Sequence, residues 1–198
     1  TGPARAVLTG ERIGLNFAQR MSGIATLTAA YVDAVAGTDA VILDTRKTTP
    51  TLRAFERHAV VCGGGRNHRL NLSDAFMAKD NHLAVLTAGG LDITQALQRV
   101  KAKLPEGMMF EVEVDRLDQI EPVIAGGVDI IMLDNFSLED LKTGVAQVAG
   151  RAVVEASGGV NLGTVRAIAE TGVDVISVGA LTHSARALDL GLDVTIDA

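Results

Sequence analysis

In this 198-residue chain, the polar and ionisable residues that could bind a ligand or take part in a reaction lie within or directly after short apolar runs. They form five groups along the chain: Asp44 to Lys47, Lys79 to His82, Glu111 and Glu113, Asp134 and Asn135, and Glu155 to Gly159. If the runs are parallel strands of an α/β barrel, their carboxyl ends meet at one mouth, where such barrels build their sites. The sequence therefore predicts one ionic site at one end of a barrel.

The basic residues are concentrated in one segment. Between Arg46 and Lys79 the chain carries seven Lys or Arg and two acidic residues, although its overall net charge is −6. A basic segment in an acidic protein favours a small anionic ligand over a nucleic acid, whose field the rest of the surface would oppose. The chain has no Trp and few aromatic residues, which also disfavours a nucleic-acid surface. A solvated basic face is the alternative.

This segment has the composition of an anion clamp. Arg46 and Arg69 have the fork geometry that binds a carboxylate through two hydrogen bonds, which lysine lacks. The other candidates are Lys47 and Lys79 as point charges, and His68 and His82 as hydrogen-bond donors. Together they indicate a ligand that carries carboxylates.

Acidic residues complement the clamp. Glu111 and Glu113 are two apart in an expected strand, so both point to one face, and carboxylates in an apolar strand need a charge or a ligand. Exposure on a sheet edge is the alternative. Asp134 ends another apolar run, where a carboxylate commonly binds a hydroxyl, a lysine or a metal. Helix N-capping by Asp134 or Asn135 is nearly as well supported.

Glycine-containing turns supply candidate phosphate sites. Ser157-Gly158-Gly159 and Gly179-Ala180 each follow an expected strand and offer backbone N–H groups, as phosphate-binding turns do. The two last strands of an α/β barrel commonly carry such turns, although any tight turn favours glycine. Gly63 to Gly65 are expected to give the chain freedom to bring residues 67–69 to the ligand, with a plain flexible hairpin as the alternative.

The order of elements indicates the fold class. Sequence patterns predict strands at 40–43, 76–78, 109–114, 128–133, 152–155 and 173–178, and helices at 15–35, 52–60, 93–103, 117–125, 138–148 and 162–169. A closed eight-stranded barrel usually takes about 250 residues, so we expect an incomplete (β/α) TIM-like barrel of about six parallel strands. A doubly wound sheet is the competitor, but no Gly-x-Gly-x-x-Gly follows the first strand. We expect one domain over 1–198, with an N-terminal helical segment at about 14–36.

Several protein classes are excluded by the sequence. No run of the roughly 18 apolar residues that a membrane span needs is present, because Asp129 interrupts even the run 123–133. The first residues lack the apolar core of a signal peptide. Cys62 is the single cysteine, so an internal disulfide is impossible and a cysteine-based metal site is disfavoured. We therefore expect a cytoplasmic protein that binds neither membrane nor nucleic acid.

Several motifs resemble the quinolinate phosphoribosyltransferase family. The most specific are Asp44-Thr45-Arg46-Lys47-Thr48-Thr49-Pro50, Gly63-Gly64-Gly65-Arg66-Asn67-His68-Arg69 and Lys79-Asp80-Asn81-His82; Ser22 to Thr26, Glu111 to Val114, Leu133 to Phe136, Ser157 to Gly159 and Val178 to Ser184 support them. The resemblance covers nearly the whole chain. It implies transfer of phosphoribose from phosphoribosyl pyrophosphate to quinolinate with decarboxylation, a step of de novo NAD biosynthesis. The implied products are nicotinate mononucleotide, pyrophosphate and CO₂.

The resemblance also implies roles for residues on the quinolinate side. The residues that would hold the two quinolinate carboxylates are Arg46, His68, Arg69 and Lys79. Arg12 would reach in from a neighbouring subunit, so the resemblance implies a homodimer or higher homo-oligomer with shared active sites.

On the phosphoribosyl side, the resemblance places Lys47 between the substrates. Glu113 and Asp134 would bind the ribose hydroxyls and the Mg²⁺ that accompanies pyrophosphate. The residues that would hold the 5′-phosphate are Ser157, Gly158 and Gly179. The catalytic group implied in this way consists of Lys47, Lys79, Glu113 and Asp134.

The chain departs from the family pattern in two places. Thr51 stands where the family usually has glycine, which we expect to shift the local backbone more than the chemistry. Family members also carry an N-terminal α/β domain of about a hundred residues, a domain-sized unit, and this chain is expected to begin after it. Two alternatives follow: a related barrel transferase of the molybdenum-transport type, and a truncated barrel that binds ligands without turnover.

Overall fold

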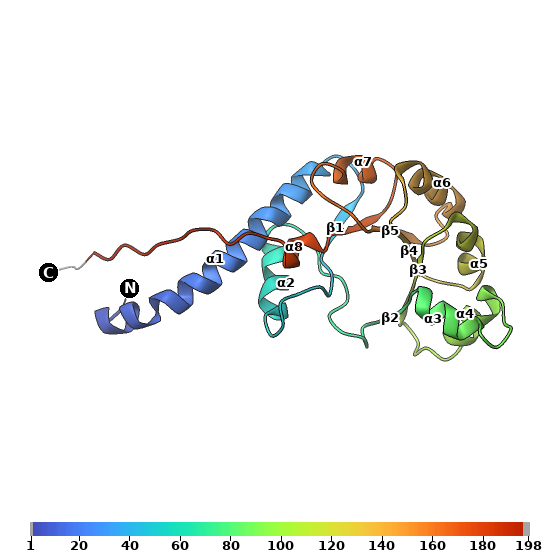
Figure 1. Ribbon diagram of the computed structural model, residues 1–198, viewed down its shortest axis with the longest axis horizontal. Helices are drawn as coiled ribbons and strands as arrows, with labels where there is room; N and C mark the ends of the chain where they lie inside the picture. Colours follow the sequence, from blue (N-terminus) through green and yellow to red (C-terminus); the bar gives the residue numbers. More distant parts are fainter. Residues whose placement is uncertain (1, 196–198) are drawn as a thin grey trace.

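Six parallel strands form one sheet in the computed structural model, which describes residues 2–195. The strands are β1 (Val41–Leu43), β2 (Ala75–Ala78), β3 (Met109–Val114), β4 (Ile130–Asp134), β5 (Val153–Ser157) and β6 (Val175–Ser177). Their order in the sheet is β1-β6-β5-β4-β3-β2, and every neighbouring pair is parallel. The first two strands along the chain are thus the two edges of the sheet, which curves without closing (Figure 1). The predicted incomplete barrel is confirmed.

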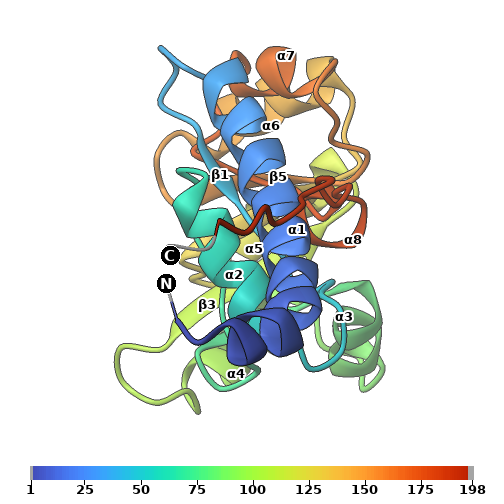
Figure 2. The same cartoon turned by 90° about the vertical axis from the view of Figure 1, so that its left-hand side faces the viewer.

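Helices cover the outer face of the curved sheet (Figure 1). They are α1 (Ala4–Ala34), α2 (Arg53–Cys62), α3 (Asp80–Thr87), α4 (Ile93–Lys101), α5 (Ile120–Ala125), α6 (Leu138–Val148), α7 (Val165–Ala169) and α8 (Ala180–His183), with a short 3₁₀ helix, η1 (Leu117–Gln119), before α5. The first helix packs beside α2 (Figure 2), and its N-terminal half extends beyond the barrel (Figure 1). No helix of the described residues 2–195 is long and apolar enough to cross a membrane.

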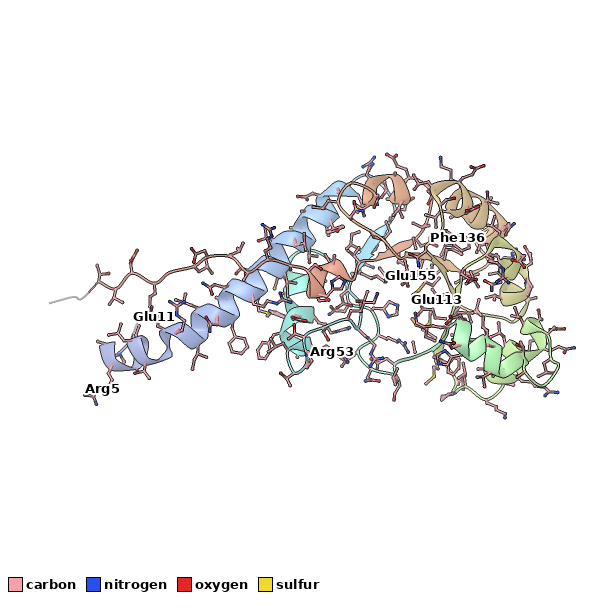
Figure 3. All side chains as sticks on the ribbon, in the orientation of Figure 1. Arg5, Glu11, Arg53, Glu113, Phe136 and Glu155 are labelled. Atoms are coloured by element: carbon pink, nitrogen blue, oxygen red, sulfur yellow. The ribbon has the colours of Figure 1, made fainter. Side chains whose placement is uncertain are left out.

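The alternation of residues along each strand positions the site. In β3, Phe110 and Val112 are fully buried on the side of the helices, whereas Glu111 and Glu113 alternate with them and face the barrel interior. Strands of a parallel sheet are covered on both faces, so the interior-facing residues are largely shielded from solvent. The labelled side chains of Glu113 and Glu155 point into this interior (Figure 3).

The N-terminal helix is longer than the sequence pattern predicts. It begins at Ala4 rather than near residue 14. Its buried residues all lie in the second half, at Gly23, Ile24, Thr28 and Tyr31. In the first half, Phe17 contacts Phe55 of α2, but no residue is buried against the described part of the chain. The apolar pattern produced by burial against the core, which predicts a helix, is therefore missing there.

Helix α3 is a second difference, because no helix was predicted after β2. Lys79 is its N-cap, and the Lys79 N–H donates to Nδ1 of His82 over 3.1 Å. Leu83 is the only buried residue of this short helix. The helix therefore lacks the apolar periodicity that sequence analysis detects.

The three consecutive glycines pack closely against α1 instead of forming a free loop. A Cβ atom on Gly65 would lie 2.8 Å from Cγ2 of Thr28, and one on Gly63 would lie 2.6 Å from Cβ of the same residue. Gly64 has φ +87°, a conformation that L-residues rarely adopt. The glycines thus allow the α2–β2 connection to approach the helix, and the predicted freedom of this segment is wrong.

Candidate functional site

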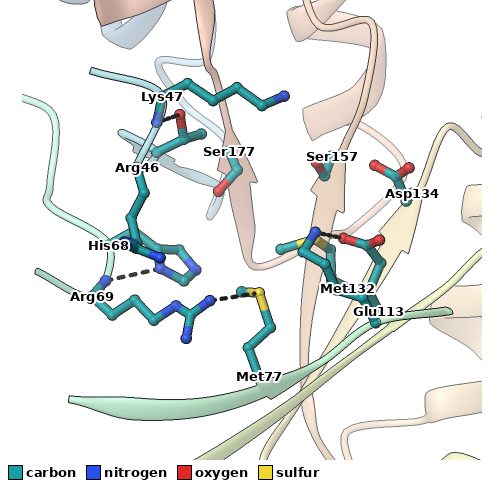
Figure 4. Close-up of a pocket in the computed structure, with 12 residues that line it drawn as sticks. Arg46, Lys47, His68, Arg69, Met77, Glu113, Met132, Asp134, Ser157 and Ser177 are labelled. Carbon is teal, nitrogen blue, oxygen red and sulfur yellow. Dashed lines mark hydrogen bonds and ion pairs between the residues drawn. The ribbon is translucent and has the colours of Figure 1, made fainter. Parts of the chain in front are cut away.

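A pocket of about 290 Å³ opens at the carboxyl ends of the strands. Its walls are Thr45, Arg46, Lys47, His68, Arg69, Met77, Lys79, Glu113, Met132, Asp134, Ser157 and Ser177 (Figure 4). These residues come from five strands or their ends and from the segments after β1 and α2. The single ionic site predicted at one mouth is therefore present. Of the residues that the resemblance assigns to the substrates, all except Arg12, Gly158 and Gly179 line the pocket directly.

The segment that carries His68 and Arg69 is held in place by two buried side chains, Asp44 and Arg57. Asp44 is fully buried and accepts the His68 N–H over 2.7 Å. Arg57 donates to the carbonyls of His68 and Arg69 over 2.6 and 3.2 Å, and it pairs with Asp44 at 3.4 Å. Burial raises the pKa of Asp44, and the His68 N–H and the Arg57 charge act in the opposite direction. The segment owes its conformation to this buried ion pair.

A second buried group lies beneath the pocket floor. Nε2 of His68 lies 3.4 Å from both Glu111 and Glu155, each of which is 1% exposed. The hydroxyl of Ser177 donates to Glu155 over 2.5 Å, whereas neither carboxyl oxygen of Glu111 has a hydrogen-bond partner among the described residues. Burial lowers the pKa of His68, but the nearby carboxyl groups of Glu111 and Glu155 outweigh that effect and raise it to about 10.

The hydrogen bonds indicate where the proton of this cluster lies. Nδ1 of His68 accepts the Arg69 N–H over 2.8 Å, a role open only to an unprotonated nitrogen. The raised pKa of His68 favours an imidazolium, but that form would set an Nδ1–H donor against the Arg69 N–H donor. We therefore place the proton on Glu111, whose pKa burial raises, so that the Nε2–H of a neutral His68 faces the two carboxyl groups. In this tautomer Nε2 is a donor, so the cluster of His68, Glu111 and Glu155 is not arranged as a metal site.

The cationic wall of the pocket is formed by residues after β1 and by Arg69. Nε of Arg46 is buried without a hydrogen-bond partner among residues 2–195, as expected for a group that an anionic ligand would satisfy. The Arg69 guanidinium donates to the Ala75 carbonyl over 3.2 Å and contacts the Met77 sulfur. These contacts direct the guanidinium along the pocket wall (Figure 4).

The acidic wall lies opposite. The Lys79 ammonium, just after the edge strand β2, pairs with the Glu113 carboxylate of the neighbouring strand β3. This pair links a residue predicted to bind quinolinate with one predicted to bind ribose. Asp134, at the end of β4, accepts from the side-chain amide of Asn135 over 2.7 Å. Asn135 has φ +57°, and Asp134 is not the N-cap of α6, because Ser137 holds that position.

The proposed phosphate turn at the end of β5 is shaped by its neighbour. Asn135 donates its N–H to the Ser157 carbonyl over 2.8 Å, which ties the ends of β4 and β5 together. Gly158 and Gly159 have φ +89° and +61°. The glycines are therefore required by the backbone conformation and leave the turn's N–H groups accessible.

The turn at Gly179 brings in a residue for which the sequence analysis gave no role. A Cβ on Gly179 would lie 3.0 Å from Nε2 of His183 and 3.3 Å from Cδ of Lys47. His183 lies in the last turn of the short helix α8, four residues after Gly179. Residues four apart in a helix are neighbours on its surface, so the spacing of Gly179 and His183 could have predicted this contact.

Two candidates lie away from this pocket. Arg12 is exposed on the part of α1 that extends beyond the barrel. His82 is occupied at the start of α3, where it accepts the Lys79 N–H. Neither residue lines the pocket, so any role for Arg12 requires a second chain.

The fold and the pocket define an open α/β barrel whose mouth is built for anionic ligands, with a cationic wall and an acidic wall. Residues 24–193 match the family described as quinolinate phosphoribosyl transferase, C-terminal domain, and the chain belongs to this family. It is 48% identical over 194 residues to a nicotinate-nucleotide pyrophosphorylase [carboxylating] of Mycobacterium leprae and 42% identical over 195 residues to a probable enzyme of that name from Bacillus subtilis.

Solved structures agree with this assignment. NadC from Streptococcus pyogenes is 48% identical, with a TM-score of 0.88 over 95% of this chain and 65% of that one. A nicotinate-nucleotide pyrophosphorylase from Francisella tularensis is 44% identical, with a TM-score of 0.87 over 94% and 65% of the two chains. The Mycobacterium and Bacillus relatives are matched over 96% and 98% of this chain but 66% of their own lengths. The chain thus spans slightly less than two thirds of these relatives.

Proposed function

We propose that this chain is the catalytic barrel of an enzyme that transfers phosphoribose from phosphoribosyl pyrophosphate to quinolinate and releases pyrophosphate and CO₂. The observation that carries the proposal is the two-sided pocket, with Arg46 and Arg69 on one wall and Glu113 and Asp134 on the other. A pyridine dicarboxylate suits the cationic wall, and a sugar with hydroxyl groups suits the acidic wall. The names of the relatives support the same reaction.

The quinolinate half of the proposed site consists of Arg46, Arg69 and Lys79. Each guanidinium can hold one carboxylate through two hydrogen bonds. Both ring nitrogens of His68 are already engaged by protein groups, so its part in the clamp is to hold Arg69 in place. The two carboxylates of the substrate thereby fix the ring nitrogen for attack.

The phosphoribosyl half would use the opposite wall and the late turns. The backbone N–H groups at Gly158 and Gly179 suit the 5′-phosphate, with Ser157 beside them. Lys47 passes over Gly179 and can reach the leaving pyrophosphate. As pyrophosphate departs, positive charge develops on the ribose ring, and the carboxylates of Glu113 and Asp134 stabilise it.

The donor set fits a magnesium ion. Glu113 and Asp134 offer carboxylate oxygens from adjacent strands, and Mg²⁺ is usually bound by one or two carboxylates together with substrate phosphates. Such an ion would neutralise the charge of the pyrophosphate. The Lys79 ammonium already neutralises Glu113 in part, so Asp134 is the freer of the two ligands.

Decarboxylation needs little from the protein. After transfer, the cationic pyridinium ring accepts the electron pair that the departing carboxylate at the neighbouring carbon leaves behind, and that carbon then takes up a proton. The walls of the pocket hold the ring and limit its contact with water.

The cytoplasmic location expected from the sequence remains a prediction.

The direct test is a product assay with quinolinate, phosphoribosyl pyrophosphate and Mg²⁺. The proposal expects nicotinate mononucleotide and CO₂ in equal amounts, dependent on Mg²⁺ and lost in Lys79→Ala. Nicotinate in place of quinolinate is the matched control, since it lacks the carboxylate that must leave. Turnover of other acceptors without CO₂ release would favour a related barrel transferase, and binding without product would favour the inactive barrel.

We further propose that the active sites are shared within a homodimer, with Arg12 completing the clamp of the partner. Arg12 lies on a half-helix that extends from the barrel and exposes Leu8 at 58%, Ile13 at 66% and Phe17 at 41%. A two-fold contact would place both helices symmetrically.

The test mixes Arg12→Ala and Lys79→Ala chains and lets them exchange subunits. Half of the dimers are then mixed, and each mixed dimer has one intact site. Activity should return to about one quarter of wild type on these statistics. No recovery after confirmed exchange would contradict the shared site.

A further inference from the structure

Helix α2 carries two adjacent buried charges, Glu56 and Arg57, that support different parts of the pocket. Glu56 is 0% exposed and Arg57 is 8% exposed. Neither residue lines the pocket. Arg57 and Asp44 hold the backbone of His68 and Arg69, as described above. Glu56 instead holds Thr49, in the segment that follows β1.

The Glu56 carboxylate anchors the segment that carries Lys47. It accepts the Thr49 N–H over 2.9 Å on Oε2 and the Thr49 hydroxyl over 2.8 Å on Oε1. The guanidinium of Arg20, from α1, donates to Oε1 over 3.0 and 3.3 Å. A buried carboxylate with this many donors fixes the segment tightly, because breaking any one contact leaves a desolvated charge short of partners.

Arg20 extends the connection to the last turn of the barrel. It donates to the Ala185 carbonyl over 2.9 Å and to the Thr182 carbonyl. The Thr182 hydroxyl in turn donates to the Lys47 carbonyl over 2.7 Å. These hydrogen bonds and the main chain between Lys47 and Thr49 therefore form a closed circuit, from Glu56 to Thr49, along the chain to Lys47, and through Thr182 and Arg20 back to Glu56.

The circuit fixes the place where Lys47 meets the proposed phosphate turn. Gly179 begins the short helix that contains Thr182, and Cδ of Lys47 lies 3.3 Å from the Cβ position of Gly179. Both the main chain of Lys47 and the helix after Gly179 are thus tied to Arg20. Neither segment has a comparable tie to Arg57, which contacts Asp44, His68 and Arg69.

We propose that Arg20 and Glu56 are positioning residues for the phosphoribosyl half of the site, while Arg57 and Asp44 position the dicarboxylate half. The inference rests on the proposed function, since it assigns the two supports to the two proposed substrates. Helix α2 is then the common base of the two halves. Misplacement of a catalytic group by about 1 Å can cost a hundredfold in rate, so such supports matter even without substrate contact.

The test compares Glu56→Gln and Arg20→Lys with Arg57→Lys as the matched control on the same helix. For the first two variants we expect KM for phosphoribosyl pyrophosphate to rise about tenfold, with a clearly smaller rise in KM for quinolinate, because Arg46 shares the segment that carries Lys47. Arg57→Lys should show the reverse split. Equal rises in both KM values for all three variants, in proportion to lost thermal stability, would overturn the proposal.

Milder and independent measurements keep the test decisive. Thr182→Val removes the hydroxyl that donates to the Lys47 carbonyl and, over 3.3 Å, to the Gly179 carbonyl, both in the phosphoribosyl half. If Glu56→Gln does not fold, this variant should raise KM for phosphoribosyl pyrophosphate more than KM for quinolinate. If wild-type protein makes no nicotinate mononucleotide, the proposed function fails. Calorimetry with pyrophosphate and with pyridine-2,3-dicarboxylate as separate probes still compares the two halves in that case. Equal loss of both affinities in Thr182→Val, or loss of the dicarboxylate affinity alone, would contradict the inference.

Discussion

Asn135 and Gly158 lie so close together that no side chain fits between them. A Cβ atom on Gly158 would lie 2.8 Å from the main-chain N of Asn135 and closer still to its side-chain amide. Asn135 follows β4 and Gly158 follows β5, so this contact joins the acidic wall of the pocket to the proposed phosphate turn. Both residues have positive φ, at +57° and +89°.

Gly158→Ala is therefore expected to damage the phosphate turn specifically. The new methyl group forces Asn135 aside, and we expect affinity for phosphoribosyl pyrophosphate to fall about tenfold or more, with quinolinate affinity nearly intact. Gly150→Ala is the control, because Gly150 has φ +72° but nothing within 4 Å of the added atom. That variant should lose about 1 kcal/mol of stability from backbone strain and keep both affinities. Calorimetry with each substrate measures the difference, and equal affinity losses in both variants would disprove the contact's role.

Arg69→Lys should weaken quinolinate binding far more than phosphoribosyl pyrophosphate binding. Lysine keeps the charge but loses the fork that matches a carboxylate, and one charge-assisted hydrogen bond is worth about 1.5 to 3 kcal/mol. The expected loss is roughly tenfold or more in quinolinate affinity. Arg66→Lys, outside the pocket, is the comparison. Calorimetric titrations that show equal loss for both substrates would rule out Arg69 as a carboxylate ligand.

Thr51→Gly should stabilise the protein. Thr51 is exposed and has φ +69°, a conformation that costs a non-glycine residue about 1 to 2 kcal/mol. The greater freedom of glycine in the unfolded chain offsets about 0.4 to 1 kcal/mol of that gain. We expect a net increase of about 0.5 to 1 kcal/mol, or about 2 °C in Tm. Thr51→Ala keeps the strained backbone and should gain less, so an equal gain would show that the strain is unimportant.

Glu111→Gln and Glu155→Gln should differ, although both residues are equally buried. Because burial raises the pKa of Glu111, its contribution to stability is present at low pH and is lost as pH rises through the raised value. Wild type should therefore lose stability as pH rises from about 4.5 towards the raised pKa, whereas Glu111→Gln, which cannot ionise, should not lose it. Glu155→Gln disrupts the carboxylate that accepts from Ser177 and should lower Tm across this pH range. A large loss at pH 7 in Glu111→Gln would show that Glu111 is ionised.

The barrel and its site were predictable to a large extent. The strands from Met109 onward and the helix 138–148 follow the sequence pattern closely, because their burial depends on local alternation and helical periodicity. Most site residues follow the strands, and parallel topology then brings them to one mouth. Short elements with little burial were harder, as α3 and the first half of α1 show.

The sequence by itself determined which residue types gather at the strand ends, and hence an anionic ligand and a transferase family. Only the tertiary structure decided how those residues are supported. Arg20 meets Glu56 across 36 positions and Thr182 across 162, and Glu111 of β3 meets His68 of the connection between α2 and β2. Such contacts leave no local periodicity, because they depend on how the whole sheet curves and on which side chain finds a partner in the dry interior.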